Sequence, residues 1–226
     1  MKRLLFVFTS FWCPFFLFSQ TADSIPAKRW SVGILLGSNN TLSKFDAYSS
    51  SEIGLSRDYF FVEAGRGSGI DLGVYISYPL NSYFILKTEP SFTISAVHYD
   101  FDLPPSEPRF GDTREFVNVE LPLHLLFEPH SGRIAPSYVI GARYVRDFAT
   151  AAQNEDPENF RFKKNDFMLD AGIGLNTYFQ KFNVRYEFSY SKGLLNQVDA
   201  AAAPSLNNPF SEVHNDRMRI RLIFYK

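Results

Sequence analysis

The stretch that decides the fold is the last ten residues of the chain, RMRIRLIFYK (217–226). Successive side chains of a β-strand point to opposite faces. Three arginines share one face and apolar residues share the other: Arg217, Arg219 and Arg221 against Met218, Ile220, Leu222 and Phe224. The strand therefore has a cationic face and an apolar face, and the fold depends on which of them is turned inward.

The same alternation recurs along the chain, whereas helical periodicity never persists over several turns. It predicts eight strands, at residues 29–38, 69–78, 83–97, 115–127, 137–148, 166–179, 182–191 and 217–226. The connections between them are long and short in turn, as in an antiparallel up-and-down membrane barrel with both chain ends on the periplasmic side. An even strand number is what single-chain bacterial barrels require.

Two arrangements fit this alternation: a secreted soluble barrel or sandwich with apolar residues inside, and a membrane barrel with them outside. The volume of the lumen decides between them. The eight strands carry on the order of 35 to 45 bulky apolar side chains, too many for an eight-stranded lumen. The opposite face is rich in glycine and serine. The sequence therefore predicts an all-β fold, an eight-stranded antiparallel up-and-down transmembrane β-barrel that carries its apolar face outward.

Charged residues of both signs fall on the predicted inward face. Buried charges are tolerated only when they are paired and hydrogen-bonded. We therefore expect a polar network in the lumen, which His124 joins as part of the polar filling. The predicted network consists of Asp71, Lys87, Glu89, Glu120, Arg143, Asp170, Arg185, Glu187, Arg217, Arg219 and Arg221.

Tyrosines gather at the ends of the predicted strands. Interfacial aromatic girdles of membrane barrels occupy such positions. The residues expected in the girdles are Tyr78, Tyr83, Tyr138, Tyr144, Tyr178, Tyr190 and Tyr225.

The N-terminus reads MKRLLFVFTSFWCPFFLFSQ, a positive start followed by a short and interrupted apolar run. A membrane-spanning helix needs roughly 20 apolar residues, so a secretory signal peptide is the better interpretation. We expect residues 1–20 to be the signal peptide, 21–28 a short N-terminal periplasmic segment and 29–226 the outer-membrane barrel. Cys13, the only cysteine, would leave with the signal peptide.

Composition and motifs argue against several other functions. A formal net charge of −1 gives no indication of nucleic-acid binding. Among the four histidines, His98 and Ser95 fall on different faces, and His130 and Ser131 are adjacent in a turn, so neither pair suits a serine hydrolase. No cluster has zinc or calcium spacing. We expect no catalytic, cofactor-binding or metal-binding residues and no small-molecule substrate. A transient polar path through the lumen remains an alternative that the sequence does not decide.

Three segments carry a resemblance to a known family: VELPLHLLF (119–127), PSYVIGARYVRDFAT (136–150) and DFMLDAGIGLNTYFQKFNVRYEFSYSKGLLN (166–196). They resemble, in the same order, segments of the PorT family of outer-membrane barrels. The resemblance implies a protein of the outer membrane of Bacteroidota. It also implies a component of the type IX secretion system, in contact with outer-membrane lipids and with other subunits of that system.

The function expected from the sequence is therefore that of a non-enzymatic outer-membrane barrel, an accessory component of type IX protein secretion. Two alternatives remain. One is a stand-alone small surface barrel for adhesion or envelope integrity, and the other is a lipid-modifying outer-membrane enzyme.

Overall fold

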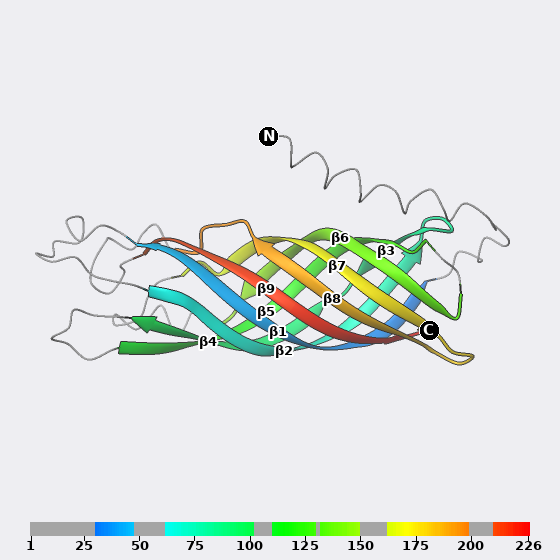
Figure 1. The fold of residues 1–226 in the computed structure, drawn as a ribbon, viewed down its shortest axis with the longest axis horizontal. Coiled ribbons are helices and arrows are strands. Elements are labelled where there is room, and N and C mark those ends of the chain that lie inside the picture. Colours follow the sequence, from blue (N-terminus) through cyan, green and yellow to red (C-terminus); the bar gives the residue numbers. More distant parts are fainter. Residues whose placement is uncertain (1–29, 48–61, 102–109, 130–131, 150–161, 199–209) are drawn as a thin grey trace, which may run out of the picture.

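A computed structural model shows a single β-barrel (Figure 1). It describes residues 30–47, 62–101, 110–129, 132–149, 162–198 and 210–226. Its strands are β1 (Ser31–Ala47), β2 (Val62–Pro79), β3 (Phe84–Thr88), β4 (Ser91–Phe101), β5 (Phe110–Phe127), β6 (Ile134–Asp147), β7 (Asn165–Tyr178), β8 (Asn183–Gly193) and β9 (Phe210–Tyr225). The predicted signal peptide and the segment 21–28 lie outside the described residues.

Strands β3 and β4 together form one continuous position in the barrel wall. Against β2, the register runs from Ile76 opposite Thr88 to Gly73 opposite Ser91, with no residue inserted or lost. The interruption falls at Glu89 and Pro90 because proline has no backbone N–H to donate to the ladder. The nine strands therefore make an eight-stranded ring, as the sequence predicted.

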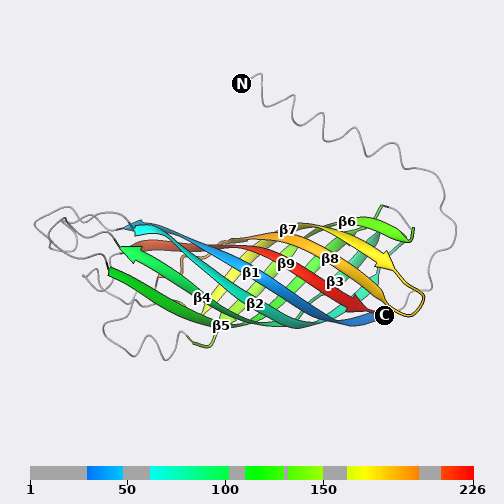
Figure 2. The same cartoon turned by 60° about the horizontal axis from the view of Figure 1, so that its bottom comes forward.

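The ring closes through antiparallel pairing of β1 with β9. Counted with β3 and β4 as one wall position, each strand pairs with the strands before and after it in sequence. The blue β1 and the red β9 run side by side in both views (Figures 1 and 2). Because β1 and β9 pair, the described ring has no open seam between its first and last strands, as a barrel in lipid requires. This topology confirms the up-and-down barrel.

Three short turns lie at the end of the barrel that also holds the C-terminus. In the first, the side-chain Oδ1 of Asn81 accepts hydrogen bonds from the backbone N–H groups of Tyr83 and Phe84, both at 2.8 Å. Asparagine commonly stabilises a turn in this way. In the third turn, Phe179 and Phe182 close a tight hairpin and their rings stack with centroids 5.1 Å apart. The strands' other ends lead to the long connections, which are outside the described residues.

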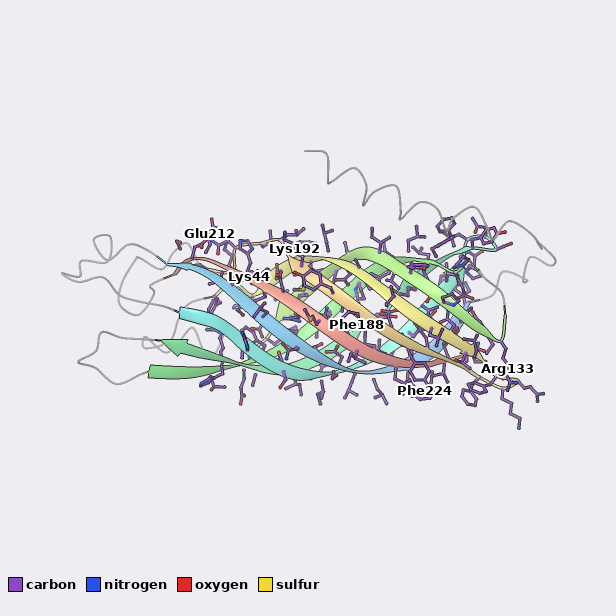
Figure 3. All side chains as sticks on the ribbon, in the orientation of Figure 1. Lys44, Arg133, Phe188, Lys192, Glu212 and Phe224 are labelled. Atoms are coloured by element: carbon purple, nitrogen blue, oxygen red, sulfur yellow. The ribbon has the colours of Figure 1, made fainter. Side chains whose placement is uncertain are left out.

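The outer face of the barrel is apolar and the lumen is polar. Leu123 and Phe188 are 59% and 47% exposed, whereas Arg219 is 0% exposed. Phe188 and Phe224, labelled in Figure 3, lie on outward-facing positions of β8 and β9. This arrangement is the inverse of a soluble barrel, and it confirms the predicted orientation of the faces.

Aromatic residues form a belt around the short-turn end. Trp30 and Tyr78 have ring centroids 5.0 Å apart, and Phe127 contacts both Phe84 and Tyr138 at 5.2 and 6.3 Å. Such belts mark the membrane–water interface of outer-membrane barrels.

Two of the predicted girdle residues, Tyr178 and Tyr225, face the lumen instead. Tyr178 donates a 2.5 Å hydrogen bond to Glu128, and Tyr225 is only 7% exposed. Both follow the alternation of their strands, since Tyr178 shares a face with Asn176 and Tyr225 shares one with Ile223. The girdle prediction was wrong at these positions because it used only their place at the strand ends.

Several strands extend further than predicted at the end with the long connections. β1 continues to Ala47 and β9 begins at Phe210, and the two strands pair along this whole extension. Within the described part of the chain, no helix is long and apolar enough to cross a membrane.

Candidate functional site: the lumen network

The candidate site is the lumen network, defined by the eleven charged residues predicted to line the lumen. The structure buries all of them, and none exceeds 5% exposure. Five are carboxylates and six are cations. They are Asp71, Lys87, Glu89, Glu120, Arg143, Asp170, Arg185, Glu187, Arg217, Arg219 and Arg221.

Glu120, on β5, contacts three arginine side chains. Its Oε1 accepts from Arg217 Nη1 at 2.5 Å, and both of its oxygens lie 3.1 Å from Arg219 Nη2. Arg143 Nη1 donates to Oε2. The three guanidinium groups come from β6 and β9, so Glu120 joins nearly opposite parts of the wall.

Asp71 extends this cluster toward β1 and β4. Its Oδ1 accepts hydrogen bonds from Asn39 Nδ2 at 2.7 Å and from Thr93 Oγ1 at 3.0 Å. Arg219 Nε lies 3.6 Å from Asp71 Oδ2. Neutral hydrogen-bond donors thus supplement the ionic contacts of this buried carboxylate.

A second cluster lies nearer the short turns. Lys87 Nζ bridges Glu89 and Glu187 at 2.8 and 2.5 Å, and Arg221 bridges the same two carboxylates at 2.8 Å each. Each carboxylate therefore binds both a lysine and an arginine. The four residues connect the β3–β4 wall with β8 and β9 across the lumen.

Asp170 and His124 link the two clusters. Asp170 Oδ2 lies 2.6 Å from His124 Nε2 and accepts from Arg143 Nε at 2.9 Å. His124 Nδ1 lies 3.9 Å from Glu89 Oε2. The contacts from Asp71 to Arg221 consequently form one connected system along the lumen axis.

Arg185 lies apart from the carboxylate clusters, at the short-turn end. Its Nε donates to Asn176 at 2.5 Å, and its guanidinium lies 5.6 and 5.8 Å from the ring centroids of Tyr75 and Tyr225. The nearest carboxylate contact is Glu187 at 4.0 Å. Aromatic faces attract guanidinium groups. The two rings therefore help to stabilise the buried positive charge of Arg185, as carboxylates do for the other arginines of the network.

A buried cluster of Leu35, Tyr75, Ile223 and Tyr225 closes the lumen beneath Arg185. Glu128 is also buried here, and it accepts hydrogen bonds from Asn176 and Tyr178. The prediction did not include Glu128, because it follows the last alternating residue of its strand and belongs by sequence to a turn.

Glycines make room for these side chains. A Cβ atom built on Gly141 would lie 2.6 Å from the His124 ring and 2.3 Å from the carbonyl oxygen of Leu123. At the outer end of the lumen, a cavity of about 20 Å³ lies beside Asn118, Asp147 and Arg217. That volume suits roughly one water molecule. Beside Arg217 the lumen side chains therefore leave room for little more than one water molecule.

The network contains no arrangement suited to nucleophilic catalysis among the described residues. His124 and Asp170 form a hydrogen-bonded pair, but His124 is fully buried and its other neighbour is a carboxylate. His98 faces outward and bonds Thr113 at 2.8 Å, whereas Ser95 faces the lumen. The described residues also hold no group of three or more His, Cys, Asp or Glu placed to bind a metal.

An apolar outer face, an aromatic belt and a charge-filled lumen define this chain as an eight-stranded barrel of the outer-membrane type. Solved structures share the fold. The outer membrane protein OprG from Pseudomonas aeruginosa matches 88% of this chain and 95% of its own, with 13% identity and a TM-score of 0.52. AlkL, an outer membrane protein solved in DMPC lipid bilayers, matches 92% of both chains with 13% identity and a TM-score of 0.52.

No protein-family model matches the chain, and no curated protein matches it. At 13% identity, the likeness to OprG and AlkL extends to the fold alone. The resemblance to the PorT family stays a prediction.

Proposed function

We propose that the protein is a non-enzymatic, non-conducting outer-membrane scaffold that acts through the surfaces at its two ends. The supporting observation is the connected lumen network, which fills the interior from Asp71 to Arg221. An ion that entered would have to separate buried pairs such as Lys87–Glu187, which would leave uncompensated charges in the lumen.

The absence of steady conduction can be measured directly. The purified protein is inserted into planar lipid bilayers, and the current is recorded at increasing voltage and salt concentration. We expect brief openings at most and no steady ohmic current. A stable, salt-dependent conductance in single insertions would contradict the proposal, since it would require a continuous aqueous path.

We further propose that the scaffold serves type IX protein secretion, as the resemblance of residues 119–127, 136–150 and 166–196 to the PorT family implies. The test is a deletion strain in which the export of proteins with type IX signals is followed. We expect these proteins to accumulate inside the cell and export to return on complementation. Normal export in the deletion strain would refute the secretion role.

The alternative is a stand-alone surface barrel for adhesion or envelope integrity. It has support from the extension of β1 and β9, whose pairing continues from Met218 out to Phe210, beyond the last apolar outward-facing residue of β9. The same deletion strain separates the two roles. Normal type IX export with loss of attachment or increased detergent sensitivity would favour the surface barrel, and altered lipid A would favour the lipid-modifying enzyme.

A further inference from the structure

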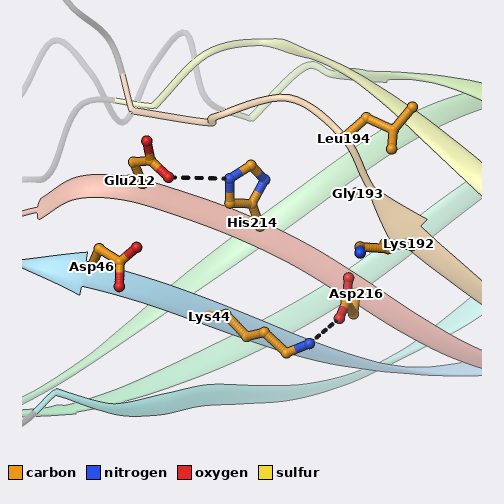
Figure 4. A pocket seen from close by; sticks show the side chains of 8 residues that line it. All are labelled: Lys44, Asp46, Lys192, Gly193, Leu194, Glu212, His214 and Asp216. Atoms are coloured by element: carbon orange, nitrogen blue, oxygen red, sulfur yellow. Dashed lines mark hydrogen bonds and ion pairs between the residues drawn. The ribbon is translucent and has the colours of Figure 1, made fainter. Parts of the chain in front are cut away.

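A groove of about 480 Å³ lies on the outer face of the barrel, where β1, β8 and β9 run toward the long connections. It is separate from the lumen. Its lining carries charged side chains of both signs and consists of Lys44, Asp46, Lys192, Gly193, Leu194, Glu212, His214 and Asp216 (Figure 4).

The groove begins where the apolar band ends. On β9, the outward-facing residues are apolar from Phe224 to Met218, and the next outward-facing residue is Asp216. Two residues of a strand cover about 7 Å, so Asp216 lies just beyond the apolar surface. Charged side chains at this height lie at the level of lipid headgroups, as lysines near the ends of membrane spans do.

The charges in the groove are ordered along the barrel axis. Lys192 lies opposite Asp216 in the β8–β9 pairing, and Lys44, opposite His214 in the β1–β9 pairing, extends its side chain to Asp216. Lys44 Nζ lies 2.6 Å from Asp216, and the Tyr190 hydroxyl donates to the same carboxylate at 2.7 Å. The negative charge of Asp216 is thus already balanced. The two lysines therefore make the part of the groove next to the apolar band positive.

The outer part of the groove is acidic. Asp46 and Glu212 lie opposite each other in the β1–β9 pairing, further from the apolar band than the lysines. Glu212 lies 3.6 Å from His214 and its side chain is 55% exposed (Figure 4). Lys192 has no ion-pair partner within the described part of the chain, and the Lys44 side chain is 58% exposed. Both charge layers are therefore open to a ligand.

We propose that this groove binds the headgroup of a lipid that carries a phosphate followed by a primary amine, of the phosphoethanolamine type. In such a lipid the phosphate is next to the acyl-bearing part and the amine is outermost. In the groove, the phosphate would lie beside the lysines near the apolar band, and the amine would lie beside the carboxylates further out. Charge-assisted hydrogen bonds from Lys192 to phosphate and from the ammonium to Glu212 are the contacts that select the headgroup.

The test measures binding of three lipids to the delipidated full-length protein in detergent by native mass spectrometry. They are phosphatidylethanolamine, phosphatidylglycerol, which has no amine, and phosphatidylcholine, whose quaternary amine cannot donate. We expect the first to bind most tightly. Lys192→Gln should weaken its binding about tenfold, the loss expected for one charge-assisted hydrogen bond.

Glu212→Gln makes the test specific. It should weaken the binding of phosphatidylethanolamine without weakening that of phosphatidylglycerol. Arg146→Gln is the matched control, because Arg146 is also exposed near this end of the barrel but outside the groove. Heat-modifiable gel migration reports whether each variant has folded. Equal or tighter binding of phosphatidylglycerol to the wild-type protein, or unchanged binding in both groove variants, would overturn the proposal.

Discussion

Replacing Glu120 with glutamine removes the carboxylate shared by three buried guanidinium groups while preserving its shape. Arg143 keeps Asp170, and Arg219 keeps Asp71 at 3.6 Å, but Arg217 is left facing a neutral amide in place of the carboxylate 2.5 Å away. Removing one partner of a buried ion pair costs about 3–5 kcal/mol. We expect a loss at the upper end of this range, because three cations are left sharing fewer carboxylates.

The assay is denaturant unfolding of the protein reconstituted in lipid vesicles, followed by gel mobility and Trp fluorescence. A loss of 3 kcal/mol lowers the folded-to-unfolded ratio more than about 100-fold. The control is Glu115→Gln on the outward face of the same strand, which should cost less than about 1 kcal/mol. The double variant Glu120→Gln/Arg217→Gln should recover part of the stability, since one unpaired charge is also removed.

An unfolding free energy of Glu120→Gln within 1 kcal/mol of the wild type would refute this reasoning. It would mean that water reaches the guanidinium groups and solvates them, and that the lumen is wetter than a filled network allows.

Three further outcomes follow from the same arrangement. Phe188→Arg should destabilise the barrel in lipid by about 2–4 kcal/mol, because its side chain is lipid-facing; an unchanged free energy of unfolding in vesicles would argue against that position. Gly141→Val should cost about 1–3 kcal/mol or prevent folding, since its Cβ would meet the His124 ring at 2.6 Å, and native heat-modifiability at wild-type stability would contradict this. Tyr75→Ala should cost about 3 kcal/mol by opening the cluster under Arg185, and a thermal scan in detergent that shows no decrease would disprove the packing role of Tyr75.

The alternation of side chains was sufficient to predict the faces of the barrel. Arg219 and Phe188 are on opposite sides of the wall, as the period of two requires. It also gave the order of the strands, because an up-and-down barrel pairs each strand with its sequence neighbour. The direction of each side chain and the pairing of consecutive strands depend on residues close together in the chain, so both can be read from the sequence.

The outer extension of β1 could not be predicted in the same way. From Ser38 to Thr41 both faces of the strand carry polar residues. Asn39 and Thr41 face the lumen, where Asn39 bonds Asp71, while Asn40 faces outward opposite Met218 of β9. With no contrast between the faces, the periodicity disappears although the strand continues.

The partners within the lumen network could not be predicted either. The sequence shows that Glu120 and Arg217 both face inward, but their 2.5 Å contact depends on how far β9 is shifted along the barrel axis relative to β5. That shift is fixed by the register of every strand around the ring and by the closure of β1 on β9. It is a property of the complete barrel.

The position of the arginines on the final strand has a consequence for assembly. The carboxylates Asp71, Glu89 and Glu120 all precede β6 in the chain, whereas Arg217, Arg219 and Arg221 arrive only with β9. A sheet that lacks its last strand would leave Asp71 without Arg219, Glu89 with Lys87 but not Arg221, and Glu120 with Arg143 as its one arginine. Transfer of these undercompensated anions into hydrocarbon would be strongly unfavourable. The electrostatic cost would thus delay insertion into the membrane until β9 has been synthesised and has paired with β1. The C-terminal strand would in this way disfavour the insertion of incomplete molecules.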